Sequence, residues 1–283
     1  MNERVQAMNE TSKNLDRGAS VRRIRFVEAI ADGDAALMSF QDPAPSYAVL
    51  AKASATATRE DADELDVVLL PLSAAPSGTQ PGFAKWLAKT NGAGAPPPVY
   101  VKLRGVELMW RPGHAILQCD PEQVEPLLAA VAEFAHYERE LRRIEREIAD
   151  GWTELEQDKG LAFEVRPADL KRGDAVGERM NRTLQRRIRL ARIEPHLYDP
   201  EAGLPAASQK LGEELRDKAR MDARLETVDA QLEVFEGIYE MSGQRMGEFR
   251  AAQKEGMLEW LIIALLAAEL VLLLAQMVWK PGA

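Results

Sequence analysis

The chain has 283 residues, which is enough for one large domain or two modest ones. Its composition is 46% hydrophobic and 29% charged, an ordinary globular balance that argues against wholesale disorder. The formal net charge of -9 argues against a nucleic-acid binder as a whole, although it leaves room for a local basic patch.

The first 19 residues are polar and show no periodicity. They lack the apolar run of a secretory signal, and Glu3, Glu10 and Asp16 argue against a transit peptide. We expect a disordered segment over residues 1–19.

Short strand-like runs follow, and we expect a small mixed α/β domain over residues 20–120. Each run is apolar or alternates polar with apolar residues, and turn residues separate them. The predicted strands are Arg23–Val27, Tyr47–Ala51, Asp66–Leu72, Val99–Leu103, Val106–Trp110 and His114–Gln118. Arg104–Gly105 predicts a hairpin, and Phe83–Lys89 predicts a short helix.

Residues 121–256 have helical periodicity instead. The spacing predicts one helix over about Val124–Gln157, with a break at Lys159–Gly160, and a second over about Asp174–Ile193 that ends near Pro195. A third is expected to run from about Ala206 into the apolar segment that follows. Its coiled-coil-like seam comprises Met221, Leu225, Val228, Leu232, Phe235, Tyr239, Met246 and Phe249, and Ser242 interrupts it.

Each of these helices can bury only one stripe, so the stripes are expected to cover each other in a long antiparallel bundle standing on a membrane. The alternative is that the third helix pairs with its copy in a dimer. The predicted class is therefore α+β: a small mixed α/β domain, a long α-helical coiled-coil-like bundle and one C-terminal transmembrane helix.

The transmembrane prediction concerns residues 257–279, in which Glu259, Glu269 and Gln276 are the polar residues. At about 1.5 Å per residue this helix is roughly 34 Å long and can cross a hydrocarbon core of about 30 Å. Trp260 and Trp279 lie near its ends, as in the interfacial aromatic belts. We expect residues 280–283 to form an external tail.

Flanking cations predict the orientation of this helix. Arg245, Arg250 and Lys254 precede it, whereas Lys280 follows and is expected to act with the two tryptophans as an interfacial anchor. The large N-terminal part is therefore expected on the cytoplasmic side of the cytoplasmic (inner) membrane.

Glu269 lies midway between the two tryptophans, near the expected bilayer centre. A charged carboxylate there costs about 2.5–3.5 kcal/mol, so it should face protein or carry a proton. Small and polar residues beside it predict a helix–helix contact in lipid. The predicted oligomerisation face comprises Ala264, Ala268, Glu269, Ala275 and Gln276. The alternative is a lone protonated glutamate tolerated in a strongly apolar helix.

Motifs of catalysis are not found: the chain has no Gly-rich phosphate loop, HExxH or GxSxG. His114, His136 and His196 are scattered and are more simply surface or capping residues than metal ligands. The single cysteine, Cys119, allows no intramolecular disulfide and is expected to be a small buried apolar residue. No catalytic, cofactor-binding or metal-ligating residue is predicted.

The segment Arg179–Ile193 contains six arginines and no acidic residue. Contact with RNA phosphates or anionic lipid is one interpretation, with Arg179, Arg182, Arg186 and Arg189 as the binding patch. The favoured alternative is pairing with acidic residues of the flanking helices, for example Glu138, Glu145, Glu226 and Glu233. Interleaved aromatic residues are missing, so direct nucleic-acid binding is not expected. The other face of this helix carries Met180, Leu184, Ile188 and Ala191.

The C-terminal residues carry a family resemblance. Leu258-Glu259-Trp260, then Ile262-Ile263 and the intramembrane Glu269, follow a helical run with an Asp199–Pro200 turn. This order resembles the "required for meiotic nuclear division" family of bacteria and mitochondria, over about residues 120–280. The N-terminal part departs from it, since relatives carry a strand such as Val-Val-Val-Phe-Trp where the nearest run here is Asp66–Leu72.

The resemblance implies a non-enzymatic protein, because mitochondrial members look like inner-membrane factors that support translation by the organelle ribosome. We expect a membrane-anchored scaffold or tether that contacts lipid, forms a homo-oligomer and recruits a cytoplasmic partner. The resemblance makes the ribosome the first partner to consider. The alternatives are an accessory subunit of a larger membrane complex and an enzyme with an unrecognised site in the α/β domain.

Overall fold

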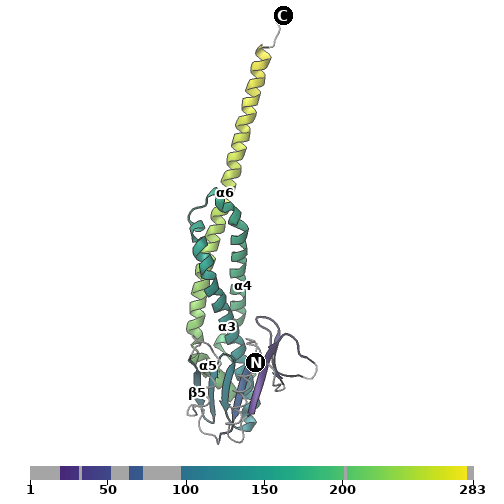
Figure 1. The fold of residues 1–283 in the computed structure, drawn as a ribbon, viewed down its shortest axis with the longest axis vertical. Coiled ribbons are helices and arrows are strands. Elements are labelled where there is room, and N and C mark those ends of the chain that lie inside the picture. The colour runs from purple at the N-terminus through teal and green to yellow at the C-terminus, as the bar shows by residue number, and fades with distance from the viewer. Residues whose placement is uncertain (1–19, 32–33, 52–63, 73–96, 201–202, 279–283) are drawn as a thin grey trace, which may run out of the picture. The chain divides into compact units, whose positions relative to one another are not determined.

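The structure is a computed structural model that describes residues 20–31, 34–51, 64–72, 97–200 and 203–278. Strands come first in the chain and long helices follow (Figure 1). The α+β class is confirmed at this level, because a seven-stranded mixed sheet precedes the helices and one long apolar helix is C-terminal. The helix predicted at Phe83–Lys89 lies outside the described residues.

The sheet has the strand order β2-β3-β1-β4-β7-β6-β5. Neighbouring strands are antiparallel except β4 and β7, which pair in parallel. The strands are β1 Ser20–Val27, β2 Ala35–Phe40, β3 Ser46–Ala51, β4 Glu64–Leu70, β5 Val99–Leu103, β6 Val106–Arg111 and β7 His114–Gln118. The sequence predicts all of these except β2, which is an edge strand whose residues are mostly exposed or half-buried, so that no clear alternation marks it.

Two local interactions set the register of the sheet. The hairpin predicted at Arg104–Gly105 is confirmed, and Gly105 has a φ of 76°, a conformation that suits glycine. Arg23 of β1 lies opposite Asp66 of β4, and its Nε donates to Asp66 Oδ1 at 2.7 Å. A cross-strand ion pair of this kind favours one register over its neighbours.

The helices are α3 Val124–Asp158, α4 Gly173–Tyr198, α5 Ala206–Lys218 and α6 Met221–Val278. A short 3₁₀ turn, η2 Pro121–Gln123, precedes α3, and the turns η3 Lys159–Ala162 and η4 Pro167–Arg172 join α3 to α4. The helix predicted at Val124–Gln157 and the break after it are confirmed. Its apolar stripe is buried at Leu127, Val131, Phe134, Leu141, Ile144, Ile148 and Leu155.

The prediction of one helix from Ala206 onward is wrong, because α5 ends at Lys218 and α6 begins at Met221. Between them Arg220 has a φ of 54°, the left-handed conformation that commonly ends a helix. Leu211 and Leu225 are 14 residues apart, which is close to four helical turns, so the sequence pattern does not reveal the turn between them.

The predicted end of the second helix near Pro195 is also too early, since α4 continues to Tyr198. Proline removes only one backbone hydrogen bond, and Pro195 lies on an exposed face where water can bind the carbonyl left over. Ile193 and Leu197 are both buried on the opposite side, so their burial stabilises this last turn.

The chain divides into two compact units, and the division falls within α3, α4 and α6. The sheet unit comprises residues 1–147 and 187–229, and the anchor unit comprises residues 148–186 and 230–283. The predicted boundary between residues 120 and 121 instead separates the last strand from the first helix along the chain.

In the sheet unit, aromatic residues of α3 cover the sheet. Trp110 of β6 meets Phe134 of α3 edge to face, with ring centroids 4.8 Å apart. His136 stacks on Phe40 of β2 at 4.0 Å, and its Nε2 lies 3.2 Å from the carbonyl oxygen of Asp42. The imidazole therefore joins the edge strand β2 and its following loop to α3.

His136 should make stability depend on pH. Burial, reinforced by the charge of Arg139, lowers the pKa of His136 from 6.5 to about 4. Between these values the unfolded chain binds more protons than the folded chain. Its contribution to the free energy of unfolding is therefore full above about pH 6.5 and falls by at most about 1.4 kcal/mol per pH unit towards pH 4.

Thermal unfolding of the full chain in mild detergent from pH 7.5 to 4.5 measures this effect. His136→Gln should show a shallower loss of stability on acidification than the wild type. His114→Gln is the matched control, because His114 lies in β7 outside this cluster, and it should keep the wild-type slope. Parallel pH profiles for the wild type and His136→Gln would contradict the assignment.

Candidate functional site

The C-terminal part of α6 is apolar on all sides and uncovered. Every side chain from Met257 to Ala275 is exposed. Its most apolar window of 18 residues has a mean hydropathy of 2.4, and none of that window is buried. Helices that are apolar all round occur in protein cores or across membranes, and this one has no core around it. Among the described residues, α6 is the one helix long and apolar enough to cross a membrane.

The predicted oligomerisation face lies on this exposed part of α6. Ala264, Ala268, Glu269 and Ala275 are exposed, so no described segment of the chain covers them. Gln276 belongs to α6, but its side chain lies outside the described set, as do Trp279 and Lys280. Trp260 is 73% exposed, as an interfacial anchor needs to be.

Before the span, α6 buries one stripe in the anchor unit. Phe235, Tyr239 and Met246 are buried, and Trp152 of α3 meets Phe235 with ring centroids 5.0 Å apart. The seam predicted for this helix is confirmed here. Ser242 is fully buried in it and donates to the carbonyl oxygen of Ile238 at 2.7 Å, so its hydroxyl is satisfied within its own helix.

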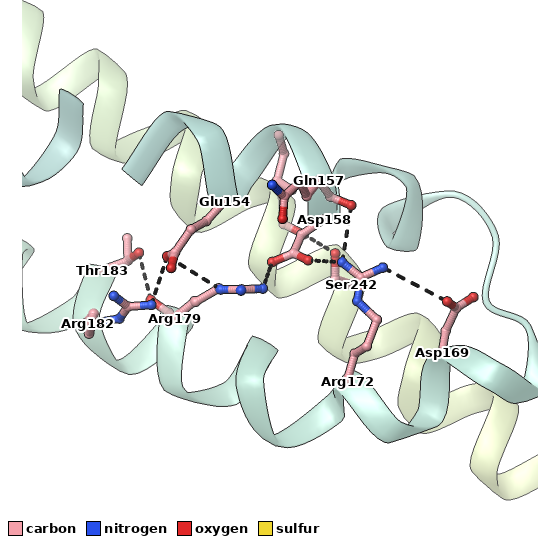
Figure 2. Close-up of polar contacts among 10 residues, drawn as sticks. Glu154, Gln157, Asp158, Asp169, Arg172, Arg179, Arg182, Thr183 and Ser242 are labelled. Atoms are coloured by element: carbon pink, nitrogen blue, oxygen red, sulfur yellow. Dashed lines mark hydrogen bonds and ion pairs between the residues drawn. The ribbon is translucent and has the colours of Figure 1, made fainter. Parts of the chain in front are cut away.

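A cluster of charged side chains, partly buried, lies at the end of α3 in the anchor unit (Figure 2). Asp158 has no exposed side-chain area and forms ion pairs with Arg172 of η4 and Arg179 of α4. Glu154, one turn earlier, lies 3.5 Å from Arg179 Nε and 2.8 Å from an Arg182 nitrogen. A buried carboxylate needs such partners, because an uncompensated buried charge costs several kcal/mol. The cluster therefore ties α3, η4 and α4 together.

The electrostatics favour the charged form of Arg179 and the neutral form of Tyr239. Burial opposes the charge on Arg179, but its hydrogen bond to Asp158 and the charges of Asp158 and Glu154 raise its pKa above the ordinary value. Burial, followed by the negative charge of Asp158, raises the pKa of Tyr239. These shifts move both groups away from titration at neutral pH, so the cluster is better suited to holding α3, η4 and α4 together than to proton transfer.

The arginine-rich segment of α4 is largely engaged in ion pairs. In the anchor unit Arg179 and Arg182 contact α3, as described above. In the sheet unit Arg189 pairs with Glu147 and Arg187 pairs with Asp229. These contacts agree in kind with the pairing alternative, although the partners differ from those suggested by the sequence.

Glu138 and Glu145, which the sequence offers as partners, bind Arg224 of α6 instead. Arg224 Nη1 lies 3.0 Å from Glu138, and its Nε and Nη2 each lie 2.8 Å from Glu145. Burial opposes this charge, but the hydrogen bond to Glu145 and both carboxylates raise the pKa of Arg224. A bidentate pair of this kind holds α3 to α6 within the sheet unit.

The face of α4 that carries the apolar residues Leu184 and Ile188 is not the face that is buried. Leu184 and Ile188 are 42% and 56% exposed. The buried stripe contains Val176, Thr183, Arg186, Leu190, Ile193 and Leu197. Arg186 is buried within this stripe, and a pattern based on hydropathy alone scores an arginine as outward-facing.

Asp158 is the central residue that the sequence pattern misses. One local signal marks it: an acidic residue in the last turn of a helix is unfavourable for the helix dipole and needs a compensating cation. Its partners lie 14 and 21 residues away, and the sequence does not identify them. Within the described residues, no group of three or more His, Cys, Asp or Glu side chains is placed to hold a metal ion.

Comparisons of the chain with protein-family models, with curated proteins and with solved structures found no match. The fold and the exposed helix define the class: an α+β protein in whose described residues one candidate membrane helix lies at the C-terminal end.

Removal of the buried carboxylate should destabilise the anchor unit strongly. Asp158→Ala removes the carboxylate that Arg172 and Arg179 share, and we expect a loss of about 2–3 kcal/mol. Glu156→Ala is the matched control, because Glu156 forms an exposed pair with Lys159 and should cost about 1 kcal/mol or less. Thermal unfolding in detergent measures both, and equal midpoints for the two variants would contradict the role of Asp158.

Proposed function

We propose that this protein is a single-pass protein of the cytoplasmic (inner) membrane and acts as a non-enzymatic scaffold or tether. The observation that carries the proposal is the uncovered apolar stretch of α6 from Met257 to Ala275. In water such a helix would expose apolar side chains on every face, whereas in a bilayer these faces contact lipid. The sheet and the remaining helices then form a cytoplasmic head.

The cations before the span support a cytoplasmic head. Arg245, Arg250 and Lys254 precede the apolar stretch and are exposed. Arg245 Nη1 pairs with Glu248 at 3.1 Å, but orientation follows the number of cations and depends little on nearby acidic residues. The head therefore stays on the side where these cations remain.

Self-association through the span is the second part of the proposal. Glu269 and Gln276 are seven residues apart and share one helix face, beside Ala268 and Ala275. Small residues allow two helices to approach closely, and polar side chains in hydrocarbon seek hydrogen-bond partners. A second copy of the same helix offers both features at the same depth.

Recruitment of a cytoplasmic partner is the third part, and it rests on the resemblance of the C-terminal residues to the "required for meiotic nuclear division" family. By that analogy the partner is the translation machinery. The runner-up is an accessory subunit of a larger membrane complex, in which the exposed Glu269 faces helices of other proteins.

Glu269→Leu tests self-association. Loss of an interhelical hydrogen bond of about 1–2 kcal/mol should weaken the oligomer roughly 5–30-fold. We expect cross-linking in membranes and analytical ultracentrifugation in mild detergent to show a shift towards monomer. Glu259→Leu is the matched control, because Glu259 lies next to Trp260 at the expected interface, and it should keep the wild-type mass. An unchanged mass for Glu269→Leu would rule out this contact.

Affinity purification from gently solubilised native membranes, with and without ribonuclease, tests the partner. Ribosomal proteins that disappear after ribonuclease treatment are the expected result. Co-purified membrane proteins that resist ribonuclease would favour the accessory-subunit alternative. A preparation of this chain alone, at a defined oligomer mass, would contradict recruitment of translation machinery.

A further inference from the structure

The turn between α3 and α4 presents an apolar side chain to its surroundings. Phe163 is 79% exposed, more than any other large apolar side chain in the described residues, those of the span included. The residues before it, Leu161 and Ala162, are buried, and the Phe163 N–H donates to Gly160 O at 3.2 Å. The backbone that carries Phe163 is therefore held by packing and by a hydrogen bond.

The end of this turn lies beside α6, close to the start of the span. A Cβ atom at Gly173 would lie 3.8 Å from the sulfur of Met246 and would clash with the guanidinium of Arg250. The first residue of α4 therefore lies against the Arg250 and Met246 side chains of α6. The buried cluster around Asp158 holds the other end of the turn (Figure 2).

The turn also lies at the end of the anchor unit from which α6 continues into its apolar stretch. In the anchor unit α3 and α6 run in the same direction, because Trp152 meets Phe235 while Asp158 acts on Tyr239 further along. The chain beyond Asp158 therefore continues towards the span. Figure 1 shows this turn where α6 continues alone.

The distance to the bilayer is short. Ten residues separate Arg250 from Trp260, which is about 15 Å of helix. The polar head-group region takes up roughly 5–8 Å of this on each side of the hydrocarbon core. This leaves about 7–10 Å between the level of Arg250, against which Gly173 lies, and the head groups, a gap that long side chains of the turn can bridge.

The charge of the turn suits an anionic surface. Residues 159–172 contain Lys159, Arg166, Lys171 and Arg172 against Glu164 and Asp169. The pairs Lys159–Glu156 and Arg166–Glu164 are exposed, with at least 55% of each side chain accessible. Exposed pairs of this kind contribute little, so their cations can turn to lipid phosphates at small cost.

We propose that residues 159–172 form a second membrane contact, in which Phe163 enters the head-group region of an anionic bilayer while Lys159, Arg166 and Lys171 contact lipid phosphates. This contact rests on the proposed function, because α6 must cross the same bilayer. The anchor unit is then held to the membrane at two points, and its orientation relative to the bilayer is fixed.

A fluorescent probe at position 164 tests this contact in the full chain. Burial, with the charge of Asp120, raises the pKa of the Cys119 thiol to about 11, so the native cysteine should resist maleimide labelling in the folded protein. Glu164→Cys places an environment-sensitive label next to Phe163 and keeps the phenyl ring. Two reference variants carry the same label: Leu266→Cys in the span and Leu184→Cys on the exposed face of α4.

The labelled proteins are placed in nanodiscs of phosphatidylcholine and phosphatidylglycerol that contain spin-labelled lipid as quencher. We expect strong quenching at positions 266 and 164 and at least threefold weaker quenching at position 184. Phe163→Ala, or removal of phosphatidylglycerol, should reduce quenching at position 164 at least twofold and leave position 266 unchanged.

Two results would overturn the inference, and they are distinguishable. Quenching at position 164 that is as weak as at position 184, with position 266 still quenched, would exclude the second contact and leave the anchor intact. Absence of quenching at position 266 would show that α6 does not enter the bilayer, and would overturn the proposed function together with this inference.

Discussion

The composition of helix α6 changes along its length, and the two parts place different demands on their surroundings. Up to Met246 it buries a single stripe and presents polar residues elsewhere, as a helix in water must. From Met257 it is apolar on every face, which water does not tolerate and hydrocarbon does. The first part needs neighbouring helices to cover its stripe, and the second has the length and composition of a helix that crosses a membrane. The packing of α3 and α4 against α6 within each compact unit follows from the first need, and the proposed membrane anchor follows from the second.

Charged pairs between the helices select the register in which their narrow apolar stripes pack. Asp158 in the anchor unit and Glu133 in the sheet unit are buried carboxylates, and arginines of other elements compensate each one. Within the sheet unit Arg224 bridges Glu138 and Glu145. Such pairs contribute modestly to stability, but any shift in register would leave a buried charge without its partner. Their value to this fold therefore lies in selecting one register for helices whose hydrophobic stripes alone would allow several.

Much of the fold can be predicted from local pattern. Alternation and turn residues locate six strands, the seven-residue spacing locates the α6 seam, and a continuous apolar run locates the stretch after it. Edge strand β2 is missed because most of its residues are exposed or half-buried, so its sequence shows no clear alternation. The turn at Arg220 is missed because the apolar residues on its two sides stay close to phase. Pro195 wrongly suggests the end of α4, because the burial of Ile193 and Leu197 outweighs the one backbone hydrogen bond that proline removes.

The candidate site could be predicted only in part, because its span and its charge cluster depend on different kinds of information. The span is a property of consecutive residues, so hydropathy alone finds it. The cluster around Asp158 joins residues from three elements, and no spacing rule connects a carboxylate at a helix end with arginines beyond the next turn. The same holds for the half-buried Arg179 and Arg189 of α4, since Glu154 and Glu147 of α3, which pair with them, are distant in sequence.

Alkaline carbonate extraction of native membranes tests the central claim most directly. The full chain is compared with a chain that ends at Glu255 and so retains the head but lacks the apolar stretch. The account predicts that the full chain stays in the membrane pellet after extraction and that the shortened chain is released. Release of the full chain into the supernatant would contradict a membrane-spanning α6, and with it the account given for the exposed apolar end of this helix.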